Sequence, residues 1–372
     1  MKKSDHLSNS WYLKPGKLFL FIVAAIVASI AGNRVLAQNP MLFSVGSILA
    51  QPGEKVTGRL NVEQGNDEAT FIPITIINGA KSGPVLTLVA GVHGTEYVPI
   101  ITAQKIIQEI EPSKLSGTLL VVQIANIPAF RAKAVYLSPI DHKNLNRIFP
   151  GKKDGTVSEC IAYTLSTEII SKSDYYIDMH GGEFTEQVVD YIYYCSSNSD
   201  SDLCQKSEML ALAMGNKYLI PDDYSSYPDS LPSKYSEVEA SRRGAVSITL
   251  EWGDRGMVKT DEVEFALRGI KNVMKTIGML EGKPFVNEHP VYLINEQSIK
   301  SSYDGILYTF VDKEQFVTQG TLIGYTTDYW GNMLEEYHSP ITGMVTFVKV
   351  APSITTGEYV YRVDEPLDKI DE

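Results

Sequence analysis

Short apolar runs of β-forming composition alternate with helical patterns along most of this chain, and this alternation constrains the possible folds more than any other feature. The runs at 71–77 and 85–90 are separated by a Gly/Pro turn, and apolar residues then follow helical spacing over 99–110. Another β run covers 118–124. Strands that alternate with helices form mostly parallel sheets with helices on both faces. The sequence therefore predicts an α/β fold with a mostly parallel mixed sheet flanked by helices.

The alternation continues through the middle of the chain. The pattern Thr156-x-x-Glu159 is a capping box, and we expect it to open a helix that runs to about Ser171. Residues 175–179 and 246–250 have the composition of short buried strands, and 261–280 that of a long amphipathic helix. These elements add strands and covering helices to the predicted sheet.

The pattern changes near residue 283. From 284 to 364, short β runs alternate with turns such as Asp304-Gly305 and Gly331-Asn332, and helical spacing is absent. We therefore expect an α/β domain over 38–283, followed over 284–372 by a small all-β, barrel-like domain with an acidic tail.

The first 37 residues have the composition of a targeting segment. Lys14 and Lys17 precede an apolar run over 18–31, and Val35-Leu36-Ala37 supplies small residues before a cleavage point near Ala37. The run is short of the roughly 20 residues that a membrane span needs. The sequence therefore predicts a signal peptide over 1–37 and an exported protein, periplasmic or secreted. A retained N-terminal anchor is the alternative.

The net charge limits the expected binding partners, and the cysteine content limits the possible disulfides. The formal net charge is −12, from 33 basic and 45 acidic residues, which argues against general nucleic-acid binding. The chain has three cysteines, and Cys195 and Cys204 flank a polar loop and could pair in an oxidising compartment. Cys160 would then be left over, and three inert thiols are the alternative.

Two histidines follow predicted strands. His93 comes after the run at 85–90 and His180 after that at 175–179, and open α/β sheets place ligands at such strand ends. Glu96 follows His93 by three residues, where a helix is expected to begin, so it can reach the same point. Two imidazoles and one carboxylate suit a catalytic zinc with a position open for water, and non-haem iron uses the same donors. A lone histidine at a strand end is more often structural.

Two further motifs hold side chains suited to substrate binding and proton transfer. Asn146 and Arg147 lie in a turn-rich segment and could grip a carboxylate through fork-like hydrogen bonds, although Arg147 could instead pair with a local acid. Glu251 ends the predicted strand at 246–250 and could be a general base, or a carboxylate that faces solvent.

In this order, the segments 91–96, 144–151 and 177–181, together with Glu251, resemble the succinylglutamate desuccinylase/aspartoacylase family of the zinc carboxypeptidase-like group. The resemblance covers about 70–350, and its most specific part is Asn-Leu-Asn-Arg-Ile-Phe-Pro-Gly at 144–151. It implies one zinc ion per chain, a bound substrate carboxylate and a catalytic base. The implied metal ligands are His93, Glu96 and His180, the carboxylate-binding residues are Asn146 and Arg147, and the base is Glu251.

The chain departs from the family pattern at one position. Family members often have an arginine, which polarises the scissile carbonyl, just before a Tyr-x-Ser-Pro-x-Asp stretch. Here Lys133 stands there, with Arg131 two residues earlier. Because lysine is a point charge and not a planar fork, substrate choice or efficiency is expected to differ.

The resemblance implies a zinc-dependent hydrolase that cleaves the amide bond of a small N-acyl amino acid or a related carboxylated substrate. A zinc carboxypeptidase acting on peptides, such as cell-wall peptides, is one alternative, and a catalytically silent binding protein is another. The expected partner is a small carboxylated substrate or a short peptide. We expect no nucleic acid, and no membrane span unless the N-terminal segment is retained. The C-terminal domain resembles a biotinyl/lipoyl-type hammerhead without the carrier lysine.

Overall fold

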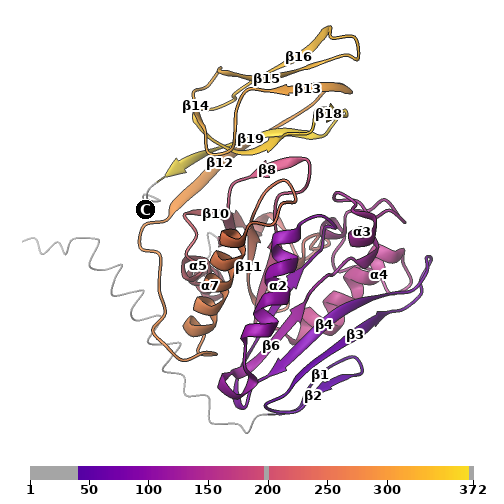
Figure 1. Cartoon of the computed structure of the whole chain (residues 1–372), viewed down its shortest axis with the longest axis vertical. Coiled ribbons are helices and arrows are strands. Elements are labelled where there is room, and N and C mark those ends of the chain that lie inside the picture. Colours follow the sequence, from indigo (N-terminus) through magenta and orange to yellow (C-terminus); the bar gives the residue numbers. More distant parts are fainter. Residues whose placement is uncertain (1–40, 197–200, 368–372) are drawn as a thin grey trace, which may run out of the picture. The chain divides into compact units, whose positions relative to one another are not determined.

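A 13-stranded mixed sheet runs through the part of the chain that the computed structural model describes, residues 41–196 and 201–367 (Figure 1). Its central strands are, in spatial order, β9 (Tyr191–Ser196), β11 (Val246–Glu251), β7 (Tyr175–His180), β5 (Lys81–Ala90) and β6 (Ser116–Val122). The last four of these are parallel, and β9 is antiparallel to β11.

Further strands extend the sheet on both sides. β4 (Thr70–Asn78) pairs antiparallel with β6, and β3 (Lys55–Val62) with β4. On the other side, β10 (Tyr218–Asp223) lies parallel to β9. A separate two-stranded ladder joins β1 (Phe43–Val45) to β2 (Ile48–Ala50).

Helices flank this sheet in two groups. α7 (Thr260–Thr276) packs against both α2 (Tyr97–Glu109) and α5 (Asp202–Met214). α4 (Val157–Thr164) and α6 (Ser236–Arg242) bury apolar side chains in one core cluster with β4 and β6. The remaining helical segments are short: α3 (Ile127–Ala132), a π turn (Leu165–Ile169), and 3₁₀ turns at Pro112–Lys114, Leu145–Arg147, Ile170–Lys172 and Tyr224–Ser226. The predicted α/β fold with helices around a mixed sheet is confirmed.

The C-terminal segment consists of strands and turns, as predicted. β12 (Val291–Lys300), β19 (Tyr359–Leu367), β17 (Gly343–Lys349) and β14 (Phe316–Val317) continue the long sheet beyond β10. β8 (Glu186–Val188), from the segment that follows β7, also pairs with β17. A second sheet holds β16 (Met333–His338), β15 (Leu322–Thr327), β13 (Gly305–Thr309) and β18 (Ser353–Ile354). The domain boundary at 283 stays a prediction.

Several local predictions can be compared with the structure. Both hydrogen bonds of the capping box at Thr156 and Glu159 are present, and the helical path continues from α4 through the π turn to Lys172. Cys195 and Cys204 form a disulfide, so the alternative of three thiols is wrong, and Cys160 is buried and free.

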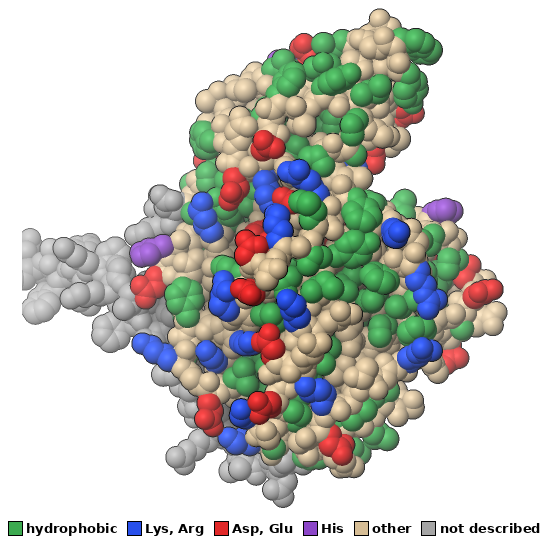
Figure 2. Space-filling view, viewed as in Figure 1, with side chains coloured by type: hydrophobic (Ala, Val, Ile, Leu, Met, Phe, Trp, Pro, Cys, Tyr) green, Lys and Arg blue, Asp and Glu red, His purple; other side chains and the backbone are tan. Residues whose placement is uncertain are grey.

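The remaining observations concern the side chains on the surface and the possibility of a membrane span. On the face drawn in Figure 2, basic and acidic side chains are interspersed over the larger lower part, and hydrophobic side chains recur on the C-terminal strands above it. Among the described residues, no helix has the length and apolar character to cross a membrane. The predicted signal peptide at 1–37 lies outside the described residues.

Candidate active site

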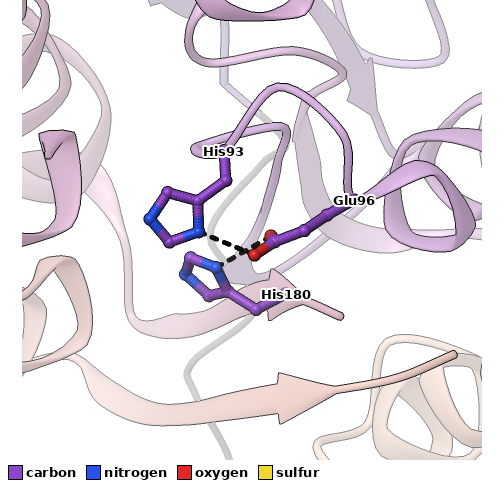
Figure 3. Close-up of side chains that lie close together, drawn as sticks. All are labelled: His93, Glu96 and His180. Carbon is purple, nitrogen blue, oxygen red and sulfur yellow. Dashed lines mark hydrogen bonds and ion pairs between the residues drawn. The ribbon is translucent and has the colours of Figure 1, made fainter. Parts of the chain in front are cut away.

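His93, Glu96 and His180 converge at one point (Figure 3). The Nδ1 atom of His93 lies 2.6 Å from Glu96 Oε1, and the Nδ1 atom of His180 lies 3.0 Å from Glu96 Oε2. One candidate ligand atom from each residue falls within 4.8 Å of the others, and all three side chains are buried. The predicted convergence of these three residues is therefore found in the structure.

The ends of β5 and β7 position these side chains. β5 ends at Ala90, and Gly91 turns the chain with a φ of +67°, a left-handed conformation that glycine adopts without strain. Glu96 then stands at the N-terminus of α2. His180 is the last residue of β7, and a Cβ on the following Gly181 would lie 2.0 Å from a backbone oxygen of Trp252. The two glycines thus allow the close approach that brings the strand ends together.

The outer nitrogens of both imidazoles have partners of their own. His93 Nε2 lies 3.0 Å from Asn144 Oδ1, and His180 Nε2 lies 3.0 Å from Asp178 Oδ2. An Nε2–H that donates to such an oxygen leaves the Nδ1 lone pair free toward Glu96. Metal-ligating histidines commonly have this second hydrogen bond, so the donor set and its supports fit a metal ion. Sequence reasoning missed both supports, although Asp178 shares a strand face with His180.

The charges of the three residues depend on one another. Burial alone would raise the pKa of Glu96, but the two imidazoles lower it to about 2. Burial likewise opposes protonation of His180, but the carboxylates of Asp178 and Glu96 raise its pKa well above the usual range. A proton on His180 thus offsets the charge of the Asp178 and Glu96 carboxylates, and a metal ion bound at Nδ1 would replace that proton.

Asn146 and Arg147 belong to the 3₁₀ turn Leu145–Arg147, which brings Asn146 beside His180. Asn146 Nδ2 is 3.2 Å from His180 Nε2, and its Oδ1 accepts a hydrogen bond from the Ser236 backbone N–H. The guanidinium of Arg147 stacks over the Tyr235 ring at 4.8 Å and donates to the Asn146 carbonyl. Within residues 41–196 and 201–367 it forms no ion pair with an acid, so the alternative of a local surface pair does not describe Arg147.

Glu251 ends β11 directly beside His180. The two residues are register partners on parallel strands, so their side chains lie on the same face of the sheet. Burial raises the pKa of Glu251 to about 8, and the carboxylates of Glu96 and Glu186 contribute to the increase. A carboxylate in such an environment is typical of a general base or acid.

The structure does not bring Arg131 and Lys133 into contact with the three converging residues. Arg131, in α3, places its guanidinium 5.9 Å from the Phe71 ring. Lys133 caps α3 with a left-handed backbone, and its side chain is exposed. Their predicted role at the scissile carbonyl stays a prediction.

Tyr136, the tyrosine of the Tyr-x-Ser-Pro-x-Asp stretch, contacts this site although the sequence analysis assigned it no role. Its ring lies 5.1 Å from the His93 ring, edge to face, and its hydroxyl donates to Glu186. Its backbone N–H donates to Glu183 Oε1 at 3.1 Å. Burial raises the pKa of Glu183 to about 10 and also that of Glu186. Local spacing gives no signal for Glu183 and Glu186, because only the tertiary fold brings them to Tyr136 and His93.

The sequence profile of the "Succinylglutamate desuccinylase/Aspartoacylase catalytic domain" matches residues 82–277. The chain belongs to the succinylglutamate desuccinylase/aspartoacylase family. The matched segment contains every residue of the site that the sequence predicted.

Relatives within and around this family span most of the chain. N-alpha-acetyl-L-2,4-diaminobutyric acid deacetylase of Halomonas elongata is 29% identical over 325 residues, which cover 84% of this chain and 92% of that protein. The product-bound ectoine utilization protein EutE (DoeB) from Ruegeria pomeroyi is 26% identical, with a TM-score of 0.75 over 88% of this chain and 99% of that chain. A succinylglutamate desuccinylase from Silicibacter sp. is 25% identical, again with a TM-score of 0.75, over 87% of this chain and all of that chain.

One residue near the site lies outside the segment that the family profile matches. Arg362, on β19, places its guanidinium 4.6 Å from the Tyr191 ring and donates to the Tyr193 hydroxyl at 2.7 Å. Tyr191 is the register partner of Glu251 on β9. The C-terminal strands therefore supply a cation to the surroundings of Glu251, whose pKa Arg362 lowers.

Proposed function

We propose that this protein is a zinc-dependent hydrolase that cleaves the amide bond of a small N-acyl amino acid. The observation that carries the proposal is the arrangement of His93, Glu96 and His180. Both Nδ1 atoms face one carboxylate, and both Nε2 atoms are held by side-chain oxygens. The deacetylase named for the Halomonas relative supports the reaction class.

The predicted site residues have separate roles in this reaction. His93, Glu96 and His180 would hold the zinc, which when bound acts as a Lewis acid and lowers the pKa of a coordinated water toward about 7. The Glu251 carboxylate takes a proton from the attacking water and returns it to the leaving nitrogen. Arg147 binds the substrate carboxylate and Asn146 supports it, which fixes the scissile carbonyl relative to Glu251.

Metal analysis together with a deacylation assay tests this proposal. We expect about one zinc per chain in the purified protein, hydrolysis of N-acetyl amino acids, and loss of both in His93→Ala and His180→Ala. The exposed His142 provides a matched control, and His142→Ala should keep metal and activity. N-acetyl amines without a carboxylate should be poor substrates, because they leave Arg147 without its anion. A wild-type protein that binds no zinc, or that hydrolyses no N-acyl amino acid, would contradict the proposal.

The cellular location can be proposed as well. We infer that the protein is exported, because the N-terminal segment has signal-peptide composition and disulfides such as Cys195–Cys204 persist in oxidising compartments. Fractionation of cells that produce the full chain tests this, and recovery of the chain from the cytoplasm with free thiols would contradict it.

A further inference from the structure

A cleft of about 360 Å³ opens to solvent between the first half of α7, the start of β10 and the segment that precedes β14. None of the proposed metal ligands lines this cleft, and neither do Asn146, Arg147 and Glu251. Its volume falls within the range of about 300 to 1,000 Å³ that is usual for small-molecule sites. The cleft is therefore a second cavity, separate from the candidate active site, with room for a small organic molecule.

One wall of the cleft is aromatic. Trp252 and Phe265 pack with their ring centroids 4.7 Å apart, and Tyr218 adds a third ring. Trp252 and Tyr218 are buried, so the surrounding structure fixes their positions, and Phe265 is half-buried. Large rigid rings of this kind cover apolar groups of a ligand well. This wall therefore suits a ligand that has an apolar part.

The charged side chains of the cleft include both signs, and some of them are already paired. Glu262 pairs with Lys259 at 2.7 Å, and Lys313 pairs with Asp254 at 3.0 Å. The Lys313 ammonium also donates to the Val188 carbonyl at 2.8 Å, which fixes the segment before β14 against the rest of the cleft. The protein itself thus compensates the charges of Glu262 and Lys313.

Two cations at the cleft have no such partner. Lys217 and Arg268 are exposed, and in the part of the chain that the structure describes neither forms an ion pair with a carboxylate. The Lys217 ammonium lies 4.6 Å from the centroid of the Tyr218 ring, and the Arg268 guanidinium lies 5.4 Å from that of the Phe265 ring. Both cations therefore stay beside the aromatic wall, where a ligand carboxylate can pair with them.

Asp190 supplies the opposite charge at the same cleft. It lies half-buried between β8 and β9, and its Oδ1 accepts a hydrogen bond from the Gly253 N–H at 3.2 Å. Within residues 41–196 and 201–367, it forms no ion pair with a lysine or an arginine. Burial raises the pKa of Asp190, and the charge of Lys313 opposes this increase. A ligand ammonium group would compensate this carboxylate.

We propose that this cleft binds a free amino acid with an apolar side chain. The ammonium group of the amino acid pairs with Asp190, and its carboxylate pairs with Arg268 or Lys217. Its side chain packs against the rings of Trp252 and Phe265. An acid without an ammonium group would leave Asp190 uncompensated, and an amine without a carboxylate would leave both cations uncompensated.

Trp252 connects the cleft to the candidate active site. It follows Glu251 in the chain, and its backbone N–H donates to the His180 carbonyl at 3.0 Å. A ligand that packs on the Trp252 ring therefore contacts the residue next to the proposed base. We expect occupancy of the cleft to change turnover, and this expectation rests on the proposed hydrolase function, whereas the binding site does not.

Isothermal titration calorimetry of the purified protein tests the site. The probes are L-leucine, isoamylamine, which lacks its carboxylate, 4-methylpentanoate, which lacks its ammonium group, and glycine, which lacks its side chain. We expect L-leucine to bind at least about 10-fold more tightly than each of the other three, because each leaves part of the cleft without its partner. Absence of L-leucine binding, or equal binding of the four probes, would overturn the proposal.

Variants locate the bound amino acid. Asp190→Asn and Arg268→Gln should each weaken L-leucine binding at least about 10-fold. Arg268 is exposed, so its variant should fold normally even if Asp190→Asn does not. Glu208 is a carboxylate whose pKa burial raises, Lys271 is a cation on α7, and neither lines the cleft. Glu208→Gln and Lys271→Gln should therefore bind L-leucine as the wild type does.

A substitution in the candidate active site distinguishes the two cavities. Arg147→Gln should keep L-leucine binding, because Arg147 does not line the cleft. Binding that is lost in Arg147→Gln and kept in Asp190→Asn and Arg268→Gln would place the amino acid in the active site and overturn the proposal.

Steady-state kinetics tests the effect on turnover. Saturating L-leucine should change kcat/KM of the wild type for an N-acetyl amino acid about 5-fold or more, and Arg268→Gln should abolish this change. An unchanged kcat/KM with the cleft occupied would refute the connection through Trp252. If no N-acyl amino acid is hydrolysed, the hydrolase proposal fails, and calorimetry still decides whether the cleft binds the amino acid.

Discussion

Glu251 differs from an ordinary strand-end carboxylate because it is half-buried, with its pKa influenced by the charges of His180, Glu96 and Glu186. Glu251→Gln keeps the shape of the side chain and removes its ability to accept a proton. We expect the variant to retain its zinc and to lose about 10²- to 10⁴-fold in kcat, the range typical of general acid–base catalysis. Kinetics and metal analysis of the same preparation check this. Glu208→Gln serves as the control, because Glu208 is also a carboxylate with a pKa raised by burial, but it accepts a hydrogen bond from the Tyr292 hydroxyl. Near-native turnover in Glu251→Gln would show that another group moves the proton.

Asp222 gives the chain a pH-dependent stability. Burial, with the nearby Asp223, raises the pKa of Asp222 from 3.8 to about 6. The folded state therefore binds more protons than the unfolded state between about pH 4 and 6, and the stability decreases as pH rises through that window. Asp222→Asn removes this contribution, so the variant should gain stability relative to wild type at pH 7 but not at pH 4. Urea denaturation at both pH values measures the difference, and an equal effect at both would refute the assignment.

The sequence allows prediction of those site residues that stand at the ends of strands. His93, His180 and Glu251 each follow an apolar run, so the topology alone places them at one edge of the sheet. Asn144 and Tyr136 reach His93 from a long loop, whose path depends on tertiary contacts that spacing does not encode. For the same reason, spacing does not show which side chain Arg131 contacts, and in the structure its guanidinium lies 5.9 Å from the Phe71 ring.

At the scale of elements, the capping box is the clearest link between sequence and local structure. Glu159 accepts a hydrogen bond from the Thr156 N–H at 2.9 Å and forms ion pairs with Lys143 and Lys152. Glu159→Ala should lower the free energy of unfolding by about 1 kcal/mol, the usual contribution of an N-terminal cap. Urea denaturation near neutral pH measures this. Glu281→Ala, which removes an exposed ion pair with Lys81, should change stability far less.

Other elements were harder to predict. β9 is an aromatic run that pairs antiparallel with β11 and parallel with β10, and nothing in local composition sets that order. The segments β8 and β10 are short, and α5 has a weakly patterned apolar face, so periodicity gives little signal there. The long strands and helices were predictable because their buried faces repeat over many residues.

At the scale of the whole molecule, one sheet joins the site to the C-terminal segment. Tyr218 and Leu219 of β10 pair with Val291 and Tyr292 of β12, which in turn pairs with β19. We expect this ladder to make unfolding of the two segments a single cooperative event. Hydrogen exchange followed by mass spectrometry in rising denaturant should then show β10 and β12 opening with the same free energy. Opening of β12 at clearly lower denaturant would contradict that expectation.

The pairing of β8 with β17 has a consequence for the time at which activity arises during synthesis. β8 begins at Glu186, which accepts the hydrogen bond of the Tyr136 hydroxyl beside His93. Its partner β17 is synthesised long after β8, because Gly343–Lys349 lies far downstream in the sequence. A nascent chain that stops before β17 lacks the strand that holds Glu186 in place. Catalytic competence therefore requires synthesis of the chain through β17, and products truncated before β17 should be inactive even when the proposed metal ligands are all present.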